Sequence, residues 1–144
     1  MKTQKGKLAL SIILVLTVFV VFAAAGGGHK IDLKADKGGK GAKGEVVVID
    51  KGAEQKEITI TMKGLKPNSV YTVWLVNMKP KMDMIGVGMG DYSFKSDDKG
   101  NANYTATISS AEMEKWQMIE IGYHPDGDPK NMNKMKIALK APVK

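Results

Sequence analysis

Short apolar and alternating segments, separated by turn residues, run through the chain from residue 45 to its end. Residues 57–63 alternate, with Ile58, Ile60 and Met62 on one face of an expected half-buried strand. Residues 70–76, VYTVWLV, are apolar on both faces, which is typical of a central strand. Comparable patterns predict further strands at 45–50, 91–95, 102–108, 117–123 and 135–139.

One helix is expected among these strands. Residues 109–112, Ser-Ser-Ala-Glu, have the Ser-x-x-Glu spacing of a capping box, which predicts a short helix over 111–116. Residues 124–133, HPDGDPKNMN, are expected to form a polar loop. The pattern as a whole predicts an all-β fold over residues 45–144, an antiparallel immunoglobulin-like β-sandwich of about seven short strands with one short helix.

The start of the chain has the three parts of a secretory signal peptide. Three lysines are followed by an apolar run from Leu8 to Phe22 and by the small residues of a cleavage site, Ala23 to Ala25. Residues 1–25 are therefore expected to direct export to the periplasm or the extracellular space. The alternative is an uncleaved N-terminal membrane anchor, because the apolar run is close to the shortest length that spans a bilayer.

Residues 26–44, GGGHKIDLKADKGGKGAKG, are mostly glycine and lysine with few large apolar groups. Such a composition offers little apolar surface to offset the entropy lost on ordering. We expect this segment to be a flexible leader.

Composition narrows the choice of functions. The chain has no cysteine, so disulfides, thiol catalysis and thiolate metal sites are excluded. The net charge is +7, and every one of the 22 basic residues is lysine. Lysine ammonium groups are point charges without the two-point geometry of arginine, so we do not expect nucleic-acid recognition. We expect instead a weak attraction to an anionic surface.

Residues 64–76, GLKPNSVYTVWLV, resemble the start of the exported C-terminal domain of the anti-sigma-K factor family. The matching positions are Leu65, Pro67, Tyr71, Trp74 and Leu75, and the resemblance extends loosely over residues 45–140, where Asp98, Gly100 and the 124–129 loop also fit. The resemblance implies a fold in which Tyr71 and Trp74 are packing residues. Only about seven residues precede the apolar run, so we do not expect the sigma-factor inhibition of that family to carry over.

The stretch 77–90, NMKPKMDMIGVGMG, is the strongest candidate for chemistry. It holds Met78, Met82, Met84 and Met89, four of the ten methionines, and is expected to lack long regular elements because of its proline and glycines. Thioether sulfur suits Cu(I), and Met132 with His124 from the other loop would add ligands. The simpler interpretation is that these methionines fill gaps or form a soft contact surface, as Met62, Met118 and Met135 are expected to do in the core.

The two histidines lie in different sequence contexts. Cleavage after Gly26 would place His29 third in the chain, where the amine, two amides and the imidazole form a square-planar set for Cu(II) or Ni(II). If the chain is cleaved at another bond, His29 is simply one residue of the flexible leader. His124 lies beside carboxylates, but no nucleophile motif accompanies it, and the better interpretation is a histidine in a turn.

No catalytic or nucleotide-binding motif is present in the sequence. The sequence therefore predicts an exported, non-enzymatic binding module without a cofactor, whose partner is another envelope or extracellular protein or an anionic surface. Its expected contact surface is formed by the loops 78–89 and 124–132. The alternative is a small periplasmic copper-binding protein that uses the methionine-rich loop.

Overall fold

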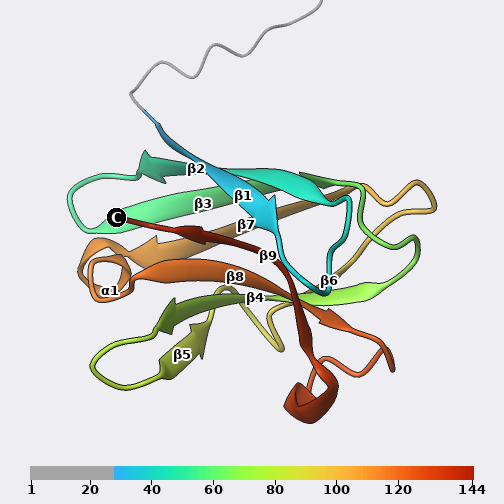
Figure 1. Ribbon diagram of the computed structural model, residues 1–144. Coiled ribbons are helices and arrows are strands. Elements are labelled where there is room, and N and C mark those ends of the chain that lie inside the picture. Colours follow the sequence, from blue (N-terminus) through green and yellow to red (C-terminus); the bar gives the residue numbers. More distant parts are fainter. Residues whose placement is uncertain (1–27) are drawn as a thin grey trace, which may run out of the picture.

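The computed structural model describes residues 28–144 (Figure 1). The predicted signal peptide or anchor, residues 1–25, lies outside the described residues, as do the first two glycines of the predicted leader. Within residues 28–144, no helix combines the length and the apolar character needed to cross a membrane.

The described residues form nine strands, one short α-helix and one short 3-10 helix. In chain order these are β1 (His29–Ala35), β2 (Lys43–Asp50), β3 (Gln55–Lys63), β4 (Val70–Asn77), β5 (Asp83–Gly86), β6 (Ser93–Lys95), β7 (Ala102–Ser109), α1 (Ser110–Met113), β8 (Met118–His124), η1 (Met132–Lys134) and β9 (Lys136–Pro142). All strand pairs are antiparallel. The predicted all-β antiparallel fold with one short helix is confirmed.

The strands join into one sheet in the order β5-β4-β8-β9-β1-β2-β3-β7, with β6 also paired to β4. The sheet curls as a half-barrel, so that β1, β2, β3 and β7 lie across from β4, β5 and β8 (Figure 1). Only two residue pairs, Lys34 with Lys140 and Ala35 with Leu139, join β1 to β9. This short seam connects the two halves of the sheet, where a sandwich would have two separate sheets.

The core fills the inside of the curled sheet. Its residues are the inward-facing members of each alternating strand, including Ile58 and Ile60 of β3, Tyr71 and Val73 of β4, and Ile121 of β8. The residues between them along each strand face outward, so the period-two pattern of the sequence assigned the core face of β3 correctly.

The predicted flexible leader is wrong for residues 28–44. Residues 29–35 form β1, which pairs with β2 over six residue pairs. Ile31 and Leu33 are 8% and 3% exposed and belong to the core. Two apolar residues are enough because β2 pairs with β1 along most of its length and β9 pairs with its last two residues.

The stretch 77–90, which was expected to lack long regular elements, contains one short strand. Residues 83–86 form β5, which pairs with the end of β4 as a hairpin. β1 and β5 account for the difference between nine strands and the predicted seven. The strand expected at 91–95 is shorter, since β6 covers only Ser93–Lys95.

The helix has the predicted cap. The hydroxyl of Ser109 accepts a hydrogen bond from the backbone N–H of Glu112 at 3.1 Å. The carboxylate of Glu112 does not complete the reciprocal half of the capping box. It instead accepts hydrogen bonds from Lys115 and from the indole N–H of Trp116, which pins Trp116 in the core.

Candidate functional site

The outer face of β4 and β8 carries buried and half-buried side chains that are not part of the core. Thr72, Trp74 and Val76 lie on the face of β4 that points away from the core residues Tyr71, Val73 and Leu75. Thr72 is paired with Gly122 and Trp74 with Glu120 in β8. This face is therefore apolar or buried where an outer face would ordinarily be polar and wet.

Thr72 is the centre of a small hydrogen-bonded cluster. Its hydroxyl oxygen accepts a bond from the indole N–H of Trp74 at 2.7 Å and lies 2.8 Å from Nε2 of His124. The sulfur of Met135 lies 3.7 Å from the same oxygen. Thr72 and His124 are 0% and 1% exposed, so the cluster is held away from water.

His124 is not in a turn, as the sequence suggested, but is the last residue of β8, and its side chain is buried. Its Nδ1 has no hydrogen-bond partner within residues 28–144. If Thr72 donates to Nε2, then Nδ1 carries an unpaired N–H; if Nε2 donates to Thr72, then Nδ1 is an unpaired lone pair. Either tautomer leaves one buried nitrogen without a protein partner, which is uncommon in folded proteins.

Met135 reaches this cluster because Gly122 has no side chain. A Cβ at Gly122 would lie 2.3 Å from the sulfur of Met135 and 3.1 Å from the Thr72 hydroxyl. Met135 follows η1, so the end of the segment 125–135 returns to the outer face of the sheet beside Thr72 and Gly122. The prediction that Met135 fills the core is thus wrong, since it packs on the opposite face of the sheet from Ile121.

A second loop borders this face from the other side. Residues 87–92 connect β5 to β6, and both ends of this loop are hydrogen-bonded to Val73 of β4. The Val73 carbonyl accepts from the N–H of Val87, and the Val73 N–H donates to the carbonyl of Tyr92. Tyr92 has a φ of 61°, which is strained for a bulky side chain. Its ring lies over Gly86, where a Cβ would come within 1.9 Å of it.

The ring of Tyr92 meets the indole of Trp74 edge to face, with centroids 5.6 Å apart and planes at 67°. This is a favourable geometry for an aromatic pair. Trp74 is paired with Gly86 in the β4–β5 ladder, so the missing side chain at Gly86 creates the space for the pair. The hydrogen bond to Thr72 fixes the indole from the other side.

A hollow of about 710 Å³ opens beside this pair. Its lining comes from β4 and from the two loops, namely Trp74, Gly90, Asp91, Tyr92, Pro129, Lys130 and Met132. The walls are largely apolar, with one acid and one base at the rim. Small-molecule sites and the central pockets of protein interfaces have this character.

Charged residues lie on the outer face between β8 and β9. Glu120 is paired with Trp74 on one side and with Lys140 on the other, and it is 9% exposed. Burial raises the pKa of the Glu120 carboxyl above its usual value, although nearby Lys140 opposes the shift. Lys140 forms its ion pair with Asp36 at 2.7 Å, and this contact lowers the pKa of Asp36.

The four methionines of the 77–90 stretch do not gather in one place. Met78 and Met82 lie beside the tip of the β4–β5 hairpin and are 52% and 63% exposed. Met84 is in β5, and Met89 is 93% exposed in the 87–92 loop. The four residues of β5, a length of about 13 Å, separate the hairpin tip from this loop.

Of the predicted ligands, Met132 and His124 are connected to the surroundings of the aromatic pair. Met132 lines the hollow and is 36% exposed, whereas His124 bonds to the threonine that holds Trp74. His29 is exposed at the first position of β1, opposite Val48. Among residues 28–144, no three His, Asp or Glu side chains come together as a metal site.

Sequence reasoning missed the residues that organise this site. Trp74 was assigned to packing and Met135 to the core, while Thr72 and Tyr92 were not singled out. One signal was available: glycines at 86 and 122 within strand patterns often mark the close approach of another group.

No protein-family model matches the sequence, and no curated protein and no solved structure matches it either.

Proposed function

We propose that this chain is an exported, non-enzymatic binding domain, and that its protein partner inserts an apolar side chain into the hollow beside Trp74. The observation that carries the proposal is the aromatic pair itself. Trp74 is held by Thr72, and Tyr92 is kept in a strained backbone conformation against it. Rigid aromatic residues in a pocket are the usual energetic centres of protein interfaces.

The surroundings support binding over catalysis. The one histidine–hydroxyl contact of the site, His124 with Thr72, is buried at both residues, so a substrate in the hollow would not reach it. The exposed methionines Met89 and Met132 add adaptable apolar surface beside the hollow. The likeness of residues 64–76 to the anti-sigma-K domain stays a prediction about fold and adds no activity.

The proposal predicts that a charge at the rim of the hollow abolishes partner binding. Peptides selected from a random library on the wild-type protein would serve as probes. We expect Met132→Lys to weaken their binding about ten-fold or more, because an apolar contact is replaced by a charge that must lose water. Fluorescence polarisation of the labelled peptides measures the affinity, and thermal melting checks the fold.

Met82→Lys is the matched control, since Met82 is also exposed but lies at the hairpin tip. Its binding should stay within about two-fold of wild type. If Met82→Lys were the variant that lost binding, the contact surface would be the hairpin and the hollow would be the wrong site. A library that yields no binder to the wild-type protein would count against the binding-domain proposal as a whole.

Copper binding is the second candidate, and one contact favours it. The imidazole of His124 and the thioether of Met135 both approach the Thr72 hydroxyl, at 2.8 and 3.7 Å. A nitrogen and a soft sulfur that are partly shielded from water suit Cu(I), and Met132 could supply a third ligand from the same segment. This set shares His124 and Met132 with the predicted ligands, but it uses Met135 in place of the hairpin methionines.

The copper proposal predicts that Cu(I) affinity depends on Met135 and not on the hairpin. Competition with a chromophoric Cu(I) chelator under reducing conditions measures that affinity. Met135→Leu keeps the volume and should weaken Cu(I) binding about ten-fold or more, whereas Met78→Leu/Met82→Leu should not change it. The proposal fails if the wild-type protein does not compete with the chelator, or if only the hairpin variant loses copper.

A further inference from the structure

A row of lysines crosses the outer face of the other half of the sheet. Lys34 of β1 is paired directly with Lys140 of β9 and with Lys43 of β2, and Lys43 is paired with Lys63 of β3. Four lysines therefore stand side by side on four neighbouring strands. Since strands lie about 4.8 Å apart, the row is about 14 Å long.

These lysines have few acids to neutralise them. Lys140 is paired with Asp36, but none of Lys34, Lys43 and Lys63 forms an ion pair with a carboxylate of residues 28–144. Like charges directly opposite each other on a sheet are destabilising. Neutral residues could occupy these outward-facing strand positions without this repulsion. Three lysines in register and without ion pairs therefore suggest a role other than folding.

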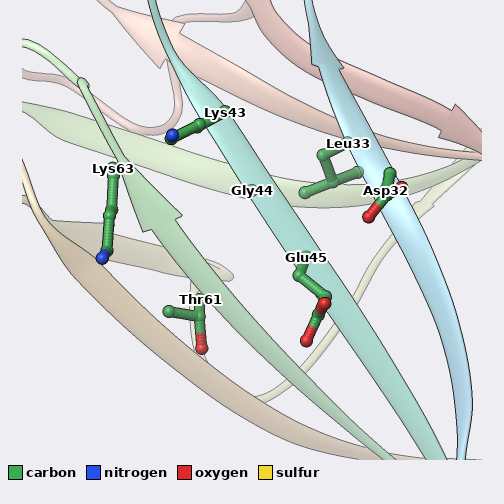
Figure 2. Close-up of a pocket in the computed structure, with 7 residues that line it drawn as sticks. All are labelled: Asp32, Leu33, Lys43, Gly44, Glu45, Thr61 and Lys63. Carbon is green, nitrogen blue, oxygen red and sulfur yellow. The ribbon is translucent and has the colours of Figure 1, made fainter.

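A shallow hollow of about 470 Å³ accompanies the row (Figure 2). Figure 2 shows Lys43 and Lys63 on neighbouring strands, with Glu45 and Thr61 further along the same two strands and Asp32 on β1. In the ladder, Glu45 is paired with both Asp32 and Thr61. A row of hydrogen-bond acceptors thus runs parallel to the row of lysines, two residues away along each strand.

We propose that this face binds a linear acidic polysaccharide. The carboxylates of the polymer would lie along Lys34, Lys43 and Lys63, and its hydroxyls would donate to Asp32, Glu45 and Thr61. The two parallel rows fit a chain that carries acid groups on one edge and hydroxyl groups on the other. The lysines Lys37, Lys40 and Lys66 of the adjoining turns add to the positive potential at this end of the sheet.

The arrangement fits other anionic partners less well. A flat anionic membrane would meet the acidic row of Asp32 and Glu45 as well as the lysines, and like charges would repel it. Single-stranded nucleic acid is held by aromatic side chains that stack on bases, and the residues lining this hollow include none. The surface lies on β1, β2 and β3 and is separate from the hollow beside Trp74, so the two proposals stand or fall independently.

The test uses alginate oligosaccharides, which are linear polyuronates, with the described domain and its variants at low salt. We expect binding that weakens as salt rises. The variant Lys34→Gln/Lys43→Gln/Lys63→Gln should bind about ten-fold more weakly, and it should melt no lower than wild type because opposed like charges have been removed. Lost binding therefore would not be explained by unfolding.

The control variant is Lys79→Gln/Lys81→Gln/Lys99→Gln, which removes the same charge from exposed positions in other turns. Its affinity for alginate should stay within about two-fold of wild type. Equal losses in the two variants would overturn the proposal, because net charge alone would then explain binding. So would the absence of alginate binding, or tighter lysine-dependent binding to phosphatidylglycerol vesicles than to alginate.

Discussion

Replacing Thr72 with valine is expected to destabilise the protein by about 3 kcal/mol, although the two side chains have almost the same shape. The change removes the oxygen that accepts from Trp74 and contacts His124. His124 already has one unpaired ring nitrogen, so its second nitrogen would lose its partner as well. Each buried polar group left unpaired costs about 1–3 kcal/mol.

Urea denaturation followed by circular dichroism measures this loss. Thr107→Val is the matched control, because Thr107 is an exposed strand threonine and its change should stay within about 0.5 kcal/mol. If the two variants were equally stable, packing alone would hold Trp74 and His124, and the hydroxyl would be unimportant. In that case the proposed rigidity of the aromatic pair would lose its basis.

Gly39→Ala is expected to have the other large effect, a loss of more than about 3 kcal/mol. Gly39 is buried in the turn between β1 and β2, against the backbone of β9. A Cβ at this position would lie 2.2 Å from the carbonyl oxygen of Ala138 and 2.8 Å from its Cα. Backbone atoms cannot rotate away as a side chain can, so the turn or β9 must shift.

Gly41→Ala in the same turn separates this clash from ordinary glycine effects. Gly41 has a φ of 83° but nothing within 4 Å of its would-be Cβ, so its loss should be about 1 kcal/mol of backbone strain. Thermal and urea unfolding of both variants measure the difference. Equal losses at the two positions would mean that the turn does not pack against β9 as tightly as described. Hydrogen exchange at Gly38, whose N–H donates to Ile137, gives an independent readout.

Long alternating segments could be predicted from the sequence, whereas strands that are short or have few apolar residues could not. β3 and β7 have eight or more residues with a clear period of two, and both were expected where they lie. β1 has only Ile31 and Leu33 as large apolar residues, and it lies in a segment rich in lysine and glycine, so the composition resembled a flexible segment. What orders it is pairing with β2 and β9, which depends on residues distant in sequence.

β9 shows a different limit. In a regular strand Ile137 and Leu139 would share one face, but a bulge pairs Gly122 with Ile137 and the adjacent Ile121 with Leu139. The bulge reverses the alternation, so Ala138 and Leu139 are both fully buried while Ile137 is only partly so. A single inserted residue of this kind leaves little trace in a hydrophobic pattern.

The candidate site was only partly within reach. The two loops, 78–89 and 124–132, were expected to form the contact surface. Residues of 124–132 line the hollow beside Trp74, whereas none of 78–89 does, and the other loop of its lining is formed by residues 90–92. The chemistry inside it depends on register instead. Trp74 faces Gly86 and Thr72 faces Gly122, and no local pattern shows which glycine lies across from which side chain.

The seam between β1 and β9 bears on how the chain folds. The hairpins on either side of it join neighbouring segments, whereas Lys34 and Lys140 are separated by nearly the whole described chain. Contacts of such long range require the largest loss of chain entropy, so the seam should close last and limit the folding rate. Until it closes, β1 and β9 both present unpaired backbone edges. A newly made chain is then most exposed to pairing with a second copy of itself, and folding at high concentration should favour exchange of β1 between molecules.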